Sequence, residues 1–507
     1  MVKQRNVIGE GSYGCVHKPS LRCLKDLKNP KKDLKNSKKD LKIDYNNYVS
    51  KIMKTSDAEA ELKEFVVIGS YDPANEYHLG TPILCQPELN DKIIDNDISK
   101  CKYVKDSEVR SQPNDYKILL MKFGGPDLKN LCNSELKKFL ATKTKLKTDR
   151  FWLEVYHLLE GLRFFRDNGI VHNDIKPQNI LFNMKTGKLV FIDFGLMRSK
   201  EDIIKSSKKS DNFLGIYHWS YPLECGLMNK DKFDAYNDLS VARQDTYKNK
   251  LSEMIVTNNV KRNTFGMLIK NPDAFNILFT YINPDGNSPS DANKYGYMEH
   301  FFDGMNNLMA NNSYDSVLNR IVSSIDVYGL GFTMKYILNC FYRLNAVNIE
   351  MFTRLSTFFY KMYDFNPETR EINIDALINE YETILFETGI LNRIKKSDDK
   401  KKLLVNKDLS HRPNKGLSLS KSLSRSLSRS LENYATLDAA SINSPDTFDK
   451  INLKQCPSEK ELNIVTNRCV KKCKPGQTRN SKFRCVSNKT RKQKEIKEIK
   501  NIIKPYK

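Results

Sequence analysis

Long apolar runs are missing from this sequence of 507 residues. No stretch of about 18 consecutive apolar residues occurs, and the first five residues lead into a glycine-rich segment instead of an apolar secretory signal. We therefore expect a soluble protein that has no transmembrane segment and is not secreted. The length leaves room for about three average domains, or for one domain that has absorbed insertions.

Recognisable cysteine pairs are also missing from most of the chain. Seven of the eleven cysteines lie in the first 340 residues at irregular spacings, which favours reduced thiols in a reducing compartment. The other four, Cys456, Cys469, Cys473 and Cys485, lie together near the C-terminal end. Zinc prefers cysteine pairs separated by about two to four residues, and only Cys469 and Cys473 come close. We favour paired or free thiols over a zinc site there.

Acidic residues do not balance the basic ones, and the surplus of +23 at pH 7 is confined to two regions. Residues 25–42 contain eight lysines and three aspartates, and residues 395–507 contain 29 basic and 11 acidic residues. The rest of the chain holds 47 residues of each sign, so the basicity belongs to accessory regions. Residues 25–42 repeat a heptad with a single leucine, too few for a coiled-coil seam. We interpret them as a solvated insertion rather than a nucleic-acid patch.

A glycine-rich motif opens the chain. Gly9, Gly11 and Gly14 have the spacing that lets a backbone turn approach phosphate groups closely, and Val16 follows where it can cover a base. Dinucleotide-binding folds use the same spacing, but there it opens a helix. Here a predicted strand with Lys51 follows, which favours an ATP-phosphate loop.

A lysine and a glutamate are expected to complete the phosphate site. Lys51, on the predicted strand 48–52, is our candidate to pair with the α- and β-phosphates. Glu61, on a predicted helix that follows this strand, is the candidate partner of the lysine. Lys54 and Glu64 are the alternatives, because they lie close by in register.

The most specific motif is VHNDIKPQNILF at residues 171–182, followed by an Asp-Phe-Gly triplet that begins at Asp193. In this order Asp174 would accept or orient the proton of a substrate hydroxyl, and Lys176 would neutralise charge on the migrating phosphoryl group. Asn179 and Asp193 would hold Mg²⁺, an ion that prefers hard oxygen ligands. The motif predicts phosphoryl transfer with ATP and Mg²⁺ as cofactors.

Together these motifs resemble the eukaryotic protein kinase family over residues 1–390. The resemblance implies an α+β, bilobal fold with a β-rich ATP lobe and a mainly helical lobe, here extended by insertions and a low-complexity basic tail. Lys176, two residues after the catalytic aspartate, resembles the serine/threonine form. The resemblance also implies that Asp326 braces the catalytic loop. It further implies that Glu224 and Arg370 form a buried ion pair with a structural role.

Three positions depart from the family pattern. Asn173 stands where most regulated kinases have an arginine that binds a phosphorylated activation loop, so switching by phosphorylation of that loop is not expected. Ile216 stands where serine/threonine kinases usually have a threonine that contacts the catalytic residues. Leu223 is an extra residue between Pro222 and Glu224. The last two departures alter the expected substrate site.

The composition divides the chain into a kinase domain and a tail. The predicted boundaries are residues 1–390 for the kinase domain, with insertions at 21–45 and 225–320; 395–450 for a disordered basic and serine-rich linker; 451–490 for two-cysteine repeats; and 491–507 for a basic tail. The repeats, CPSEKELNIVTNRCV and CKPGQTRNSKFRCV, resemble a two-cysteine adaptor module of large DNA viruses. This resemblance implies that the tail attaches the protein to a virion or host protein.

We therefore expect a viral serine/threonine protein kinase that acts on protein substrates in the host cytoplasm or the virion. The alternative, from a different class, is a pseudokinase scaffold that acts through its basic, cysteine-containing tail. Nucleic-acid binding by the tail is a weaker alternative, because no aromatic platform accompanies the charge. No membrane partner is expected.

Overall fold

The computed structural model divides the chain into two compact units, Met1–Ile394 and Lys395–Lys507. It describes residues 6–11, 14–24, 45–89, 101–141, 145–209, 219–257, 263–264, 267–268 and 274–397, and in the second unit residues 460–463, 468–471, 477–479 and 485–487. Within these ranges no helix is both long enough and apolar enough to cross a membrane.

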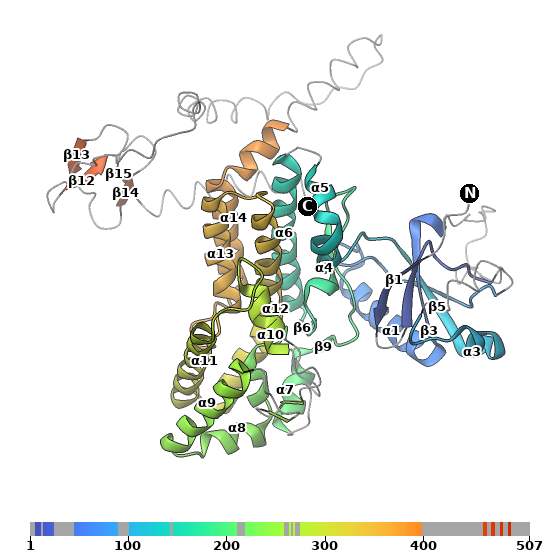
Figure 1. Ribbon diagram of the computed structural model, residues 1–507, viewed down its shortest axis with the longest axis horizontal. Helices are drawn as coiled ribbons and strands as arrows, with labels where there is room; N and C mark the ends of the chain where they lie inside the picture. Colours follow the sequence, from blue (N-terminus) through green and yellow to red (C-terminus); the bar gives the residue numbers. More distant parts are fainter. Residues whose placement is uncertain are drawn as a thin grey trace, which may run out of the picture. The chain divides into compact units, whose positions relative to one another are not determined.

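The first unit begins with a five-stranded antiparallel sheet (Figure 1). Its strands lie in the order β1 (Asn6–Gly11), β2 (Gly14–Lys18), β3 (Tyr48–Lys54), β5 (Tyr116–Lys122) and β4 (Ile83–Cys85). In the pairing of β2 with β3, Val16 lies opposite Lys51 and Cys15 lies opposite Ile52. Because successive residues of a strand point to opposite faces, Val16 and Lys51 share one face of the sheet, and Cys15 and Ile52 share the other.

Helix α1 (Thr55–Tyr71) follows β3 without a loop and packs against β3 and β5. Its residue Ala58 is fully buried against Met53 and Leu119, which lie on the same face of the sheet as Lys51. Asp57 in the first turn is favoured by the helix dipole. The helix therefore covers the Lys51 face of the sheet and holds its acidic residues close to the strand.

A second core covers the Cys15 face of the sheet. Residues 20–24 run beside β4, with the Leu24 N–H donating to Gln86 O (2.8 Å) and the Glu88 N–H donating to Arg22 O (2.8 Å). Helix α3 (Asp106–Ser111) contributes Val109 to the same core. Leu21 is also buried there although it belongs to the predicted insertion 21–45, of which residues 25–44 lie outside the described part of the chain.

Two disulfides cross this second core. Cys15 is bonded to Cys101 and Cys23 to Cys85, with Cα–Cα distances of 5.8 and 5.6 Å. The prediction of reduced thiols is therefore wrong for four of the seven cysteines in this part of the chain, whereas Cys132, Cys225 and Cys340 are free. The bonded partners are 86 and 62 residues apart. Only the packing of residues 20–24 and 101–111 on the sheet brings them together.

Helices make up most of the remaining described part of the first unit (Figure 1). The helices and helical turns are η1 (Tyr45–Asn47), η2 (Pro113–Asp115), α4 (Leu128–Asn130), η3 (Leu131–Glu135), α5 (Leu136–Ala141), α6 (Lys145–Asp167), η4 (Pro177–Asn179), α7 (Lys200–Lys208), η5 (Leu223–Leu227), α8 (Lys230–Asn237), α9 (Val241–Val256), α10 (Ala274–Ile282), α11 (Asp291–Asn311), α12 (Tyr314–Arg343), α13 (Ile349–Tyr363) and α14 (Ile374–Glu387). The short strand pairs are β6 (Ile170–Val171) with β9 (Arg198–Ser199), β7 (Ile180–Phe182) with β8 (Leu189–Phe191), and β10 (Asn263–Thr264) with β11 (Met267–Leu268). Helices α8 to α11 lie within the predicted insertion 225–320.

Helix α12 forms the centre of the helical part. It is buried without interruption from Ser324 to Phe341, which is typical of a helix surrounded by other elements. Helices α6, α7, α10 and α13 pack against it. At its C-terminal end Phe341 contacts Phe151 and Trp152 of α6, with ring centroids 4.8 and 5.3 Å apart. This helix is the rigid element that positions residues 172–179, the predicted catalytic loop.

Lys335 places a charge inside this helical core. Its side chain is 4% exposed, and its Nζ donates to Ser356 Oγ (2.6 Å) and lies 4.7 Å from the ring centroid of Phe352. Burial lowers the pKa of Lys335 to about 8, whereas a lysine of the unfolded chain titrates near about 10.4. The folded protein therefore carries the cost of a buried ammonium below about pH 8, and this cost disappears as the pH rises to about 10.4.

We expect Lys335→Met to raise the free energy of unfolding by about 1–2 kcal/mol near about pH 7. Removal of the buried charge stabilises the variant, and loss of the bond to Ser356 offsets part of this gain. The gain is expected to shrink to nothing near about pH 10. Urea unfolding of both proteins at the two pH values measures it. The exposed Lys63→Met is the control and should change stability little at either pH. An equal gain for Lys335→Met at both pH values would contradict the assignment.

The second unit contains two β-hairpins within its described residues. Strand β12 (Lys460–Asn463) pairs with β13 (Arg468–Lys471), and β14 (Gln477–Arg479) pairs with β15 (Cys485–Ser487), both antiparallel. Cys469 and Cys485 lie on the second strand of their hairpins. Cys456 and Cys473, residues 398–450 of the predicted linker and the predicted tail 491–507 lie outside the described residues.

Candidate active site

The glycine-rich segment forms the β1–β2 hairpin. A Cβ atom at Gly14 would lie 2.1 Å from the backbone oxygen of Ile52, so a side chain there would force β2 away from β3. Gly9 faces Val16, whose Cβ lies 3.8 Å from the position of a Cβ at Gly9. Gly11 ends β1, and residues 12–13 at the tip lie outside the described part of the chain. Gly14 thus sets the distance between the hairpin and the strand that carries Lys51.

Lys51 and Glu61 form an ion pair. The Lys51 Nζ is 2.5 Å from Glu61 Oε2, which joins β3 to α1. Burial raises the pKa of Glu61 and the lysine opposes the rise. Lys54, the alternative lysine, is exposed at the end of β3. The other alternative, Glu64, lies one turn along α1, and burial together with Glu61 and Asp193 raises its pKa to about 7.

The catalytic loop brings three predicted residues together around one carboxylate. Lys176 Nζ donates to both carboxylate oxygens of Asp174, at 2.9 and 2.7 Å, and Asn179 Nδ2 donates to Asp174 Oδ2 (2.7 Å) and to its backbone oxygen (2.9 Å). Burial raises the pKa of Asp174 to about 6, and Lys176 opposes this rise. The carboxylate is thus fixed in direction by two donors.

Helix α12 holds this loop through hydrogen bonds to its backbone. The Asp326 carboxylate accepts the N–H groups of His172 (2.7 Å) and Asn173 (2.9 Å), as the family resemblance predicts. Burial raises the pKa of Asp326 to about 6, and the two backbone donors oppose the rise. A Cβ at Gly329 would lie 2.5 Å from the backbone oxygen of Ile175. The glycine therefore allows α12 to touch the catalytic loop.

The Asp-Phe-Gly triplet connects the sheet part of the site with the loop. Asp193 has a left-handed backbone (φ 62°), a conformation that aspartate tolerates better than most residues. Phe194 is buried, with its ring centroid 6.1 Å from that of Phe65 on α1 and 4.8 Å from that of His172. Burial lowers the pKa of His172 to about 4, so the imidazole is a neutral packing group. The contact of Phe194 with Phe65 was not predicted from the sequence, although Phe65 lies one helical turn after Glu61.

Mg²⁺ fits the available ligands only as an ion shared with a nucleotide. Within the described residues, no three histidine, cysteine, aspartate or glutamate side chains gather in a way that could hold a metal. Asn179 uses its amide nitrogen for Asp174, so its amide oxygen is the atom suited to a cation. Mg²⁺ sites commonly use one or two protein oxygens together with phosphate oxygens and water. The predicted pair of Asn179 and Asp193 has this character.

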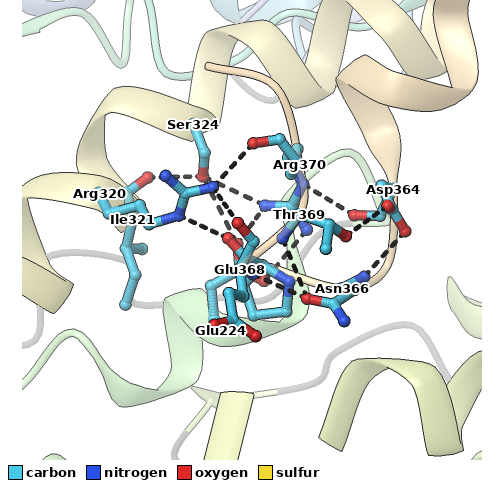
Figure 2. A network of polar contacts seen from close by, with 10 residues as sticks. Glu224, Arg320, Ile321, Ser324, Asp364, Asn366, Glu368, Thr369 and Arg370 are labelled. Carbon is cyan, nitrogen blue, oxygen red and sulfur yellow. Dashed lines mark hydrogen bonds and ion pairs between the residues drawn. The ribbon is translucent and has the colours of Figure 1, made fainter. Parts of the chain in front are cut away.

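The predicted pair of Glu224 and Arg370 is confirmed and lies at the centre of a buried network (Figure 2). The side chains are 1% and 2% exposed, and both terminal nitrogens of Arg370 donate to the Glu224 carboxylate. Arg370 Nε also donates to the Asp364 backbone oxygen (2.8 Å). Leu223 starts the helical turn η5 and is itself buried, so the extra residue is absorbed there without loss of the pair. Ile216 lies outside the described residues.

Asn173 contacts two residues of the chain beyond the Asp-Phe-Gly triplet. Its Nδ2 donates to Leu196 O (3.3 Å), and its own backbone oxygen accepts the hydroxyl of Tyr221 (2.9 Å). Its left-handed conformation (φ 63°) is one that asparagine adopts more readily than most residues. The uncharged amide of Asn173 therefore binds the main chain of the segment that contains Leu196.

Residues 127–222, which contain the catalytic loop and the Asp-Phe-Gly triplet, match the family model described as Protein kinase domain. These residues support a eukaryotic-type protein kinase. The chain is 39% identical to mitogen-activated protein kinase 12 of Homo sapiens over 83 residues, 16% of this chain and 20% of that protein. It is 33% identical to a probable cell division protein kinase of Encephalitozoon cuniculi over 110 residues, 21% of this chain and 31% of that protein. A putative serine/threonine-protein kinase/receptor of Acanthamoeba polyphaga mimivirus is 39% identical over 67 residues, 13% of this chain and 4% of that protein.

The kinase similarity therefore spans less than a third of each of these relatives. Gly9, Lys51 and Glu61 lie outside the residues that match the family model, as do the helices from α8 onward and the tail.

Proposed function

We propose that the protein is an ATP- and Mg²⁺-dependent serine/threonine protein kinase, which transfers the γ-phosphate of ATP to hydroxyl groups of protein substrates. The observation that supports it most is the Asp174 carboxylate, which is oriented by Lys176 and Asn179 in a loop that Asp326 braces. Phosphoryl transfer depends mainly on positioning and charge stabilisation. This loop supplies both.

In the proposed reaction Asp174 orients the substrate hydroxyl and accepts its proton, and Lys176 balances negative charge on the phosphoryl group in transfer. Lys51, held by Glu61 at 2.5 Å, binds the α- and β-phosphates below the β1–β2 hairpin. Asn179 and Asp193 would hold Mg²⁺, and the ion would supply positive charge that offsets the negative charge of the phosphate groups. Lys176, two residues after Asp174, favours serine and threonine over tyrosine as acceptors.

The tail is proposed to be an attachment region for a virion or host protein. Each two-cysteine repeat contains one β-hairpin, and the second cysteine of the repeat lies on the second strand of that hairpin. Two hairpins of the same construction give two similar surfaces, which suits repeated weak attachment. A viral origin and the organisation into kinase domain, linker and repeats belong to the same proposal.

Asp174→Ala is expected to lower kcat for a serine peptide by about 100-fold or more, because a positioned general base contributes about 10²–10⁴ in rate. Phosphate incorporation into serine, threonine and tyrosine versions of one peptide measures activity and acceptor type together. Asp115→Ala, an exposed aspartate of η2, is the matched control and should leave kcat unchanged.

Equal phosphate incorporation by wild type and Asp174→Ala would end the enzyme interpretation. A wild-type protein that binds nucleotide but transfers no phosphate would favour the pseudokinase scaffold. Faster phosphorylation of the tyrosine peptide than of the serine peptide would contradict the serine/threonine assignment alone.

A further inference from the structure

The segment that follows the Asp-Phe-Gly triplet is folded. Strand β9 pairs with β6, with Val171 opposite Arg198, and the Lys200 N–H donates to Gly169 O (2.8 Å). Helix α7 begins directly afterwards, and Ser199 caps it by accepting the Asp202 N–H (3.0 Å). The first part of the activation segment is therefore a strand and a capped helix.

Helix α7 packs against α12, and two side-chain contacts show that it runs antiparallel to the first half of that helix. Lys200 Nζ donates to Ser323 Oγ (3.0 Å), and Lys208 Nζ lies 3.0 Å from Asp315 Oδ1. The two contacts are eight residues apart on each helix, which is about 12 Å at 1.5 Å per residue. Equal spacing on both helices keeps them in register.

The same helix α12 holds the catalytic loop. Asp326, which accepts the N–H groups of that loop, lies less than one helical turn after Ser323. The segment that carries Asp193 and the loop that carries Asp174 are thus both tied to one rigid helix. The bond from Asn173 Nδ2 to Leu196 O links the two directly (3.3 Å).

The side chains of α7 contribute unequally to holding the helix in place. Lys208 and Asp315 are 46% and 62% exposed, and an exposed ion pair contributes little. Ile203, in contrast, is fully buried, and burial of a whole isoleucine side chain is a major stabilising contribution. Ile204, its neighbour, is only partly buried. Ile203 is therefore the residue that holds α7 in place.

We propose that α7 takes the place of activation-loop phosphorylation: the helix, anchored by Ile203 as a positioning residue, keeps the segment after Asp193 in the productive arrangement without a phosphate. This inference rests on the proposed kinase function. Two features agree with it. Asn173 offers an amide where a phosphate would require a cation, and Ile203 is fully buried, so the anchor of α7 needs no charged partner.

The test compares Ile203→Asp with Ile204→Asp in the full-length chain, with Ile203→Val as the conservative variant. We expect Ile203→Asp to lower kcat for a peptide substrate by about 100-fold, since small displacements of positioned groups cost about that much. Its dissociation constant for an ATP analogue should stay within about twofold of wild type, because Lys51 and the glycine hairpin are not disturbed. Ile204→Asp and Ile203→Val should keep kcat within about threefold.

A second arm tests the independence from phosphate. Wild type treated with a phosphatase until its intact mass shows no phosphate should keep its kcat within about twofold. A fall of about tenfold or more would overturn the proposal, as would an Ile203→Asp variant with the kcat of wild type.

The proposed function and this inference fail in different ways. An inactive wild type counts against the function, whereas an active Ile203→Asp counts against the inference only. Amide hydrogen exchange over residues 198–208 gives a readout independent of activity. It should rise in Ile203→Asp and remain at the wild-type level in Ile204→Asp, and an unchanged rate in Ile203→Asp would also overturn the proposal.

Discussion

Replacing Arg370 by leucine is expected to lower the free energy of unfolding by about 3–5 kcal/mol, because it leaves a buried carboxylate without its partner. Glu224 is 1% exposed, and within the described network its carboxylate is held by Arg370, with a longer contact from Ser324 Oγ at 3.5 Å (Figure 2). The variant also loses the bond from Arg370 Nε to Asp364 O. Few single substitutions in this chain should cost as much.

A double-mutant cycle separates the pair from the packing around it. Glu224→Leu with Arg370→Leu should cost less than the sum of the two single changes, because the double variant contains no unpaired buried charge. Urea unfolding followed by circular dichroism measures all four proteins. The exposed pair of Arg354 and Glu387, 2.6 Å apart and about 40% exposed, is the control and should contribute less than about 1 kcal/mol.

A cost for Arg370→Leu no larger than that for Arg354→Leu would contradict the assignment of a buried pair. Strict additivity of the two single changes would contradict it as well, since independent sites add and coupled sites do not.

Short motifs made the catalytic loop predictable from the sequence. Asp174, Lys176 and Asn179 lie within six residues of one another, so a single turn of the chain brings them together whatever the surroundings do. Lys51 and Glu61 were predictable for a related reason, because a strand runs directly into a helix and their separation of ten positions fixes which side chains face each other. Where spacing along the chain determines spacing in the fold, sequence reasoning succeeds.

Contacts that depend on distant segments could not be predicted in this way. The docking of α7 depends on Ser323 and Asp315, more than a hundred residues further along the chain. The second core of the sheet depends on residues 20–24 and 101–111, which carry no motif. The chain passes from one to the other through about 80 residues, so their spacing contains no signal of the contact. The same reason explains why the two disulfides were missed.

Loss of either disulfide is expected to lower the free energy of unfolding by about 4 kcal/mol. The bonds close loops of 86 and 62 residues, and the entropy lost by the unfolded chain grows slowly with loop length, reaching about 4–5 kcal/mol at this size. Because the loop closed by Cys23 and Cys85 lies inside the one closed by Cys15 and Cys101, removing both should cost less than twice this amount. A change of this size is a large part of the stability of a typical domain, about 5–15 kcal/mol.

The bond between Cys15 and Cys101 also lies next to the proposed nucleotide site, so its oxidation state should affect that site. Cys15 lies between Gly14 and Val16 on β2, so the bond to Cys101 anchors the back of the strand whose other face carries Val16 beside Lys51. Cytosolic proteins usually keep their thiols reduced. The reduced protein should therefore have a less firmly held hairpin than the oxidised one.

The measurement compares wild type with a variant in which Cys15, Cys23, Cys85 and Cys101 are all replaced by serine. Reductant should lower the urea midpoint of wild type and leave that of the variant unchanged; the cysteines of the tail are present in both proteins, so their contribution cancels. Mass spectrometry of unreduced digests should show peptides joined through Cys15 and Cys101. An equal response of both proteins to reductant would show that these four cysteines are not the source of the stabilisation. In that case the second core would have to be held by its apolar residues alone, with Leu21, Val109 and Ile118 at its centre.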